Sequence, residues 1–121
     1  MTRPKLFLDD TRQPPEVDML LARDAAEFDE MLETHKATGF SEIYFDHDLG
    51  YRAGNGHECL EHLIERCELE GYPHPDIIYV HTMNREEWHK MAFRAAHYFP
   101  DTVTVRKIDG GQFLQRDGSR A

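Results

Sequence analysis

The sequence predicts an α/β fold built around one parallel sheet. Short apolar runs rich in β-branched and aromatic residues alternate along the chain with longer helical patterns. Most of these runs show no polar alternation, which is typical of strands covered on both faces. Strands that alternate with helices imply βαβ units and therefore parallel pairing. The length of 121 residues is that of a single domain.

Five apolar runs are the predicted strands, and they lie at 6–8, 19–22, 43–45, 77–80 and 103–105. The connection between the first two, residues 10–18, contains Pro14 and Pro15 and is too short for a full helix. We therefore expect the first helix of the fold to be reduced. The predicted domain covers residues 1–108, and a Gly-rich polar tail that we expect to be flexible follows at 109–121.

Three helices are predicted between the later strands. The first and the third begin with capping boxes, at 24–27 and 84–87, and the second follows the glycine turn at 54–56. Each continues with apolar residues at helical spacing. These residues are Phe28, Met31 and Leu32 in the first helix, Leu60, Leu63, Ile64 and Cys67 in the second, and Trp88, Met91, Ala92 and Ala95 in the third.

Composition excludes several classes of function. The net charge of −9 argues against binding to duplex DNA, which depends on Lys and Arg. No apolar run approaches the ~20 residues of a membrane span. Cys59 and Cys67 lie on one predicted helix about 12 Å apart, too far for a disulfide. We therefore expect a cytoplasmic protein with two core thiols, and a phosphate ligand remains open because a metal ion can supply positive charge.

Polar residues follow four of the five predicted strands. They lie at 9–10, 46–48, 81–82 and 106–107. In an open parallel sheet the carboxyl ends of the strands meet at one edge, where ligands bind. A single Asp or His at such a position is usually a turn former or a structural group. Their coincidence at four strand ends predicts a functional acidic pocket.

The pocket concentrates negative charge from two strand ends. Like charges about 5 Å apart repel by about 3 kcal/mol at an effective dielectric constant near 20. The cluster therefore favours a bound divalent cation or a retained proton. Carboxylates alone suit Mg²⁺, whereas His47 or His81 as ligands would suit Mn²⁺, iron or Zn²⁺. The carboxylates are Asp9, Asp10, Asp46 and Asp48.

The pattern resembles the receiver domains of response regulators. The pair Asp9-Asp10 matches the metal-binding acidic pair of receivers, Asp46 their phospho-accepting Asp, and Lys107 approximately their Lys. His81 stands where receivers carry a hydroxyl, and Thr82 is adjacent.

A narrower family is more similar. The segments LFLDDTRQPP (6–15), FDHDLG (45–50) and VHTMN (80–84) resemble the cyclic-phosphate processing receiver domain of bacteria and phages. The resemblance covers about residues 4–108. It implies a flavodoxin- or receiver-like fold in three layers, with a doubly wound parallel five-stranded sheet in the order 2-1-3-4-5 and a reduced first helix.

Residues and resemblance together predict a metal-dependent phosphoesterase that acts on a cyclic phosphate of a nucleotide or RNA end. Mg²⁺ or Mn²⁺ is the expected cofactor, held by Asp9, Asp10 and Asp46 with help from Asp48. The expected catalytic residues are His47, His81 and Asp46, the two histidines serving as general base and general acid. The expected phosphate contacts are Arg12, Thr82, Asn84 and Lys107.

The alternative is a receiver-like signalling module, or a module that binds a cyclic nucleotide without turnover. It would accept phosphate on Asp46 or hold the nucleotide and then engage a partner. His47 and His81 favour the enzyme, because a phospho-aspartate switch needs neither imidazole. The particular cyclic phosphate, the metal and the oligomeric state stay open at this point.

Overall fold

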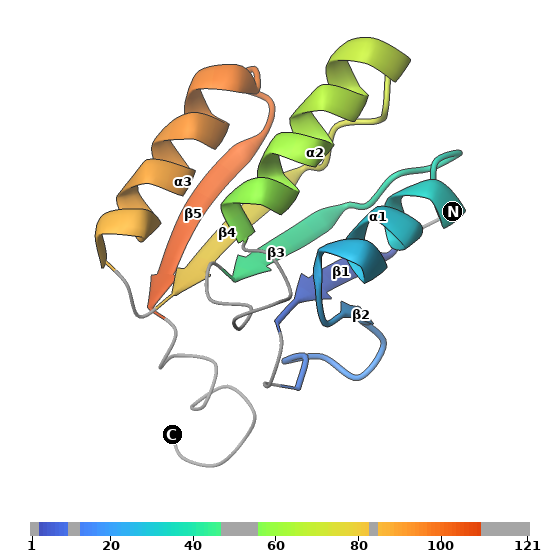
Figure 1. Ribbon diagram of the computed structural model, residues 1–121, viewed down its shortest axis with the longest axis horizontal. Helices are drawn as coiled ribbons and strands as arrows, with labels where there is room; N and C mark the ends of the chain where they lie inside the picture. Colours follow the sequence, from blue (N-terminus) through green and yellow to red (C-terminus); the bar gives the residue numbers. More distant parts are fainter. Residues whose placement is uncertain (1–2, 10–12, 47–55, 83–84, 110–121) are drawn as a thin grey trace.

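The computed structural model describes residues 3–9, 13–46, 56–82 and 85–109 of the chain. Its centre is a five-stranded parallel sheet in the order β2-β1-β3-β4-β5 (Figure 1). The predicted sheet and strand order are confirmed. The strands are β1 (Lys5–Leu8), β2 (Leu20–Ala22), β3 (Glu42–Asp46), β4 (Ile77–Thr82) and β5 (Thr104–Asp109).

Three helices alternate with the later strands, as predicted: α1 (Ala25–Thr34), α2 (Gly56–Glu70) and α3 (Arg85–Tyr98). Asp24 caps α1 as predicted, because its carboxylate accepts a hydrogen bond from the Glu27 backbone N–H at 2.8 Å. The Glu27 carboxylate accepts one in turn from the Arg23 N–H at 2.7 Å. Asn84, the cap predicted for α3, lies outside the described residues.

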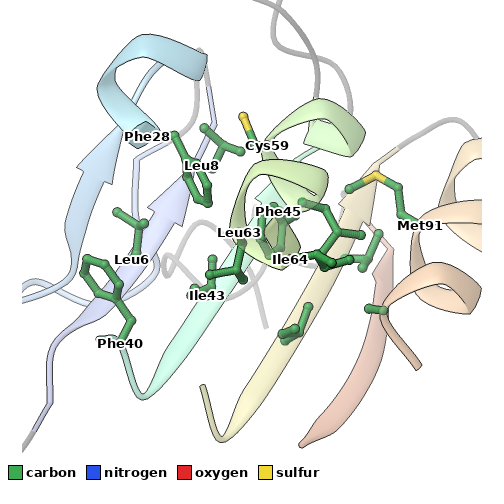
Figure 2. Close-up of a cluster of buried hydrophobic side chains, with 14 of the residues drawn as sticks. Leu6, Leu8, Phe28, Phe40, Ile43, Phe45, Cys59, Leu63, Ile64 and Met91 are labelled. Carbon is green, nitrogen blue, oxygen red and sulfur yellow. The ribbon is translucent and has the colours of Figure 1, made fainter. Parts of the chain in front are cut away.

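All three helices pack against the same face of the sheet (Figure 1). Their apolar stripes meet the inward side chains of β1, β3 and β4 in the main core (Figure 2). Fully buried members from the sheet are Leu6, Leu8, Ile43, Phe45, Ile78 and Val80, and from the helices Phe28, Leu32, Cys59, Leu60, Leu63, Met91 and Ala95.

The opposite face of the sheet carries a smaller apolar cluster of Phe7, Met19, Tyr44 and Ile108. No helix packs on this face among the described residues, so the third layer of the predicted fold is not found in this part of the chain. The β1–β2 connection contributes no helix to this face, since its described residues 13–19 form bends and turns. The first helix is thus reduced, as expected. Residues 110–121, the rest of the predicted tail, lie outside the description.

The two cysteines are free and buried in α2. Burial raises the pKa of the Cys59 thiol to about 12 and that of Cys67 to about 11. Both thiols therefore stay protonated and unreactive near neutral pH. Among the described helices, none combines the length and apolar character needed to cross a membrane.

Gly39 closes the turn between α1 and β3 in a conformation that suits only glycine. Its φ is +65°, and its N–H donates to the His35 carbonyl at 2.7 Å. A Cβ atom at this position would lie 2.9 Å from the Cβ of Pro73. The turn therefore packs directly against the connection that leads into β4.

We predict that Gly39→Ala destabilises the domain more than Gly71→Ala. Gly71 is the matched control, since its φ is +68° but an added Cβ would meet nothing within 4 Å. Both changes force a residue with a side chain into the left-handed region, at about 1–2 kcal/mol. Gly39→Ala adds the overlap with Pro73, so its loss in urea unfolding should be larger by about 1 kcal/mol or more. Equal losses for the two variants would contradict the packing of this turn.

Candidate functional site

Three neighbouring strands end in polar side chains that have almost no exposure to solvent. Asp46, the last residue of β3, lies opposite His81 of β4 in the sheet register. Asp9 follows β1 directly, and its N–H extends the ladder by donating to the Ala22 carbonyl at 3.1 Å. The exposed fractions are 0% for Asp9, 2% for Asp46 and 0% for His81. We call these residues the Asp9–Asp46–His81 triad.

The triad brings together three donor atoms of the kinds that bind metal ions. One carboxylate oxygen from each aspartate and one imidazole nitrogen lie within 4.8 Å of one another. The His81 Nδ1 atom is 3.8 Å from the Asp9 Oδ2 atom. Ligand atoms about 2.1 Å from a Mg²⁺ ion lie at most about 4.2 Å apart, so small side-chain rotations would let these atoms share one cation. Two carboxylates and an imidazole suit a divalent ion.

The electrostatics of the triad also favour a bound cation. Two carboxylates within 4.8 Å repel by about 3 kcal/mol at an effective dielectric constant of 20. Burial increases the demand for compensation, because ionised groups away from water are stable only with partners or metals. A protonated imidazole or a divalent cation supplies the positive charge that this arrangement needs. The donor set therefore fits the metal that the sequence implies.

The orientation of the His81 ring is fixed by aromatic neighbours. Its ring stacks on that of Phe7, with a centroid separation of 5.2 Å and an interplanar angle of 9°. Tyr44 approaches the same imidazole at 6.5 Å in a tilted arrangement. Side chains alternate along a strand, so Phe7 and Asp9 share one face of the sheet, as do Tyr44 and Asp46. An aromatic layer thus lies next to the triad, two residues earlier along the same strands and on the same face of the sheet.

Arg23 also belongs to the site, although the sequence analysis did not single it out. It follows β2, and its Nη1 atom donates to the backbone carbonyl of Asp9 at 3.2 Å. This contact holds the chain at the point where Asp9 enters the triad. The signal was present in the sequence, because Arg23 follows a strand in the same way as the other site residues.

Lys107, a predicted phosphate contact, lies away from the triad. It pairs with Val80 in the register, whereas His81 pairs with Ile108, so Lys107 and His81 lie on opposite faces of the sheet. The Lys107 Nζ atom is 3.0 Å from the Nδ1 atom of His89. It also lies 5.6 Å from the centroid of the Trp88 ring. The structure thus directs this cation toward α3.

The other predicted site residues fall largely outside the described part of the chain. Thr82 ends β4 in register with Asp109, but its side chain is not described. The remaining residues in this group are Asp10, Arg12, His47, Asp48 and Asn84.

Comparison with known families gives the same family that three segments of the sequence resemble. A family model described as the cyclic-phosphate processing receiver domain matches residues 4–96, most of the chain. The chain belongs to the cyclic-phosphate processing receiver domain family. The matched region of this receiver domain includes all three members of the triad and ends before β5, so Lys107 lies outside it. Neither the curated proteins nor the solved structures gave a match.

We predict that Asp46→Asn stabilises the metal-free receiver domain. Removing one of two close buried charges relieves their repulsion, so the free energy of unfolding in EDTA should rise by about 1–2 kcal/mol. Asp76→Asn is the matched control, because Asp76 is 73% exposed in its ion pair with Arg3 and should change stability by at most about 1 kcal/mol. Chemical denaturation at pH 7 measures both. A clear loss of stability in Asp46→Asn would show that the two acids do not repel in the folded protein.

Proposed function

We propose that this receiver domain is a metal-dependent phosphoesterase that opens a cyclic phosphodiester on a nucleotide or RNA end. The family description supplies the cyclic phosphate. The observation that carries the enzymatic part is the buried Asp9–Asp46–His81 triad. An aspartate that only accepts a phosphoryl group needs no imidazole within 4.8 Å, whereas an imidazole is the side chain best suited to proton transfer at neutral pH.

The aspartates of the triad would hold the metal. Asp9 and Asp46 offer the carboxylate oxygens that Mg²⁺ and Mn²⁺ prefer. When bound, such an ion stabilises the negative charge that develops on a phosphoryl group and lowers the pKa of a bound water. Asp10 and Asp48, next to these two in sequence, are proposed as supporting ligands.

His81 is proposed to carry a proton during hydrolysis. The reaction forms a bond between a water oxygen and phosphorus, breaks one ester P–O bond, and transfers a proton to the leaving oxygen. Asp9 faces Nδ1 of His81 at 3.8 Å, which leaves Nε2 as the atom that donates to the leaving group. The stack on Phe7 fixes the ring plane, so the proton is delivered in one direction. His47 is proposed as the matching general base.

The remaining proposed contacts bind the phosphate. Arg12 would hold non-bridging oxygens bidentately, and Thr82 and Asn84 would donate hydrogen bonds from the end of β4. Lys107 would act as a point charge only after leaving its contacts with His89 and Trp88.

We predict that millimolar Mg²⁺ or Mn²⁺ raises the melting temperature by at least about 4 °C, because a ligand that binds only the folded state stabilises it. The double variant Asp9→Asn, Asp46→Asn should show no rise. Asp29→Asn is the control, since Asp29 pairs with His62 on the helix surface and its loss should leave the metal response intact. Differential scanning fluorimetry gives all three values. A wild-type melting temperature that ignores both metals would remove the metal from the proposal.

We predict that His81→Asn lowers kcat by about 10²- to 10⁴-fold and leaves the metal-induced rise in melting temperature unchanged. The substrates to screen are 2′,3′-cyclic nucleotides, 3′,5′-cyclic nucleotides and ADP-ribose cyclic phosphate. KM should change little, because the metal and phosphate contacts remain.

His62→Asn serves as the control, since His62 lies on the surface of α2 against Asp29 and should keep wild-type kcat. Near-normal kcat in folded His81→Asn would exclude the acid–base role. Loss of the metal response in that variant would make His81 a ligand instead. Binding of a cyclic nucleotide without product in the wild type would identify a module without turnover.

A further inference from the structure

The sheet face opposite the helices presents an aromatic row beside the triad. Phe7, Tyr44 and Tyr79 are neighbours in the register of β1, β3 and β4, and no helix of the described residues covers this face (Figure 1). Two residues further along the same strands, on the same face, come Asp9, Asp46 and His81. The aromatic row and the triad are therefore consecutive layers on one face of the sheet.

Tyr79 is the member of this row that a ligand can reach. Its ring stacks on that of Tyr44, with a centroid separation of 4.2 Å and an interplanar angle of 14°. Tyr44 is only 1% exposed, whereas Tyr79 is half-buried. One side of the Tyr79 ring is thus covered by Tyr44, and the other side faces β5.

The neighbouring strand on that second side carries an exposed arginine. Arg106 of β5 pairs with Tyr79 in the register and is exposed. It lies on the same face, because Ile108, two residues later, belongs to the same apolar cluster as Tyr44. Nucleic-acid bases stack on aromatic rings such as that of tyrosine and on the guanidinium plane of arginine.

We propose that Tyr79 and Arg106 hold the base of the substrate, which makes that substrate a nucleoside cyclic phosphate rather than the cyclic phosphate of a simple polyol. This inference rests on the proposed function. Tyr79 and His81 are two residues apart on one strand, a rise of roughly 7 Å. That span is comparable to a nucleoside, so a base on Tyr79 places its phosphate at the triad.

The chemistry of this base site also predicts its selectivity. Stacking uses the π-face that every base has, and it reads no hydrogen-bond pattern. The domain should therefore accept several bases, and purines should bind more tightly than pyrimidines because their rings are larger. The Arg106 guanidinium adds a cation–π interaction with the base. A lysine at position 106 would supply the charge but no planar group that stacks on the base.

The test compares a substrate that has a base with one that has none. Adenosine 2′,3′-cyclic phosphate and glycerol 1,2-cyclic phosphate are assayed with wild type, Tyr79→Leu, Tyr79→Phe and Arg106→Gln in Mn²⁺. Thr104→Ala is the control, because Thr104 is exposed on β5 but pairs with Ile77. Calorimetric titration with AMP measures base binding without turnover.

Tyr79→Leu should raise KM for the adenosine substrate and weaken AMP binding by about 5- to 100-fold. Its kinetics on the glycerol substrate should stay at the wild-type values, and Tyr79→Phe should keep near-normal affinity. Arg106→Gln should lose less than Tyr79→Leu, and Thr104→Ala should lose nothing.

The two proposals can fail separately. If the wild type hydrolyses both substrates with equal efficiency and Tyr79→Leu changes neither, the base site is excluded and the phosphoesterase stands. If no cyclic phosphate is hydrolysed but AMP binds in a manner that depends on Tyr79, the phosphoesterase is excluded and the base site stands.

Discussion

The register of the three central strands determines every contact at the site. Leu8 lies opposite Phe45 and Phe45 opposite Val80, so the residues that follow, Asp9, Asp46 and His81, meet at one level of the sheet. A shift of any strand by one residue would turn its polar side chain toward the helices. Leu8, Phe45 and Val80 oppose that shift, because it would move them out of the main core and onto the opposite face of the sheet. The apolar core therefore sets the geometry of the polar triad.

The same alternation explains what the sequence could and could not predict. Asp9, Asp46 and His81 were found from the rule that carboxyl ends of parallel strands converge, which needs only the position of each strand. The same rule predicted Lys107 at the site, but its side chain lies on the other face of the sheet. Lys107 is one residue away from the position in β5 that pairs with His81, and successive side chains on a strand point to opposite faces. The stack of His81 on Phe7 depends on contacts between strands distant in sequence. No local pattern encodes such a contact.

The helices were predictable for a related reason, whereas the face of the sheet on which each described helix packs was not. Capping at Asp24 and the apolar stripe around Phe28 and Leu32 are local signals, and both are present in α1. The side of the sheet on which a helix packs depends on the crossover that precedes it. The short Pro-containing connection after β1 leaves the face with Tyr44 and Tyr79 without a helix from that crossover. That face carries the aromatic side chains beside the triad.

The two edges of the sheet have a consequence for self-association. β2 has only three residues, and β5 carries Arg106 and Lys107 at consecutive exposed positions, one toward each face. Short strands and charged side chains at sheet edges oppose the addition of a further strand from another chain. Backbone pairing between copies is thus disfavoured at both ends. The domain can therefore keep Tyr79, the half-buried member of the aromatic row, in contact with solvent without the polymerisation that open edges invite.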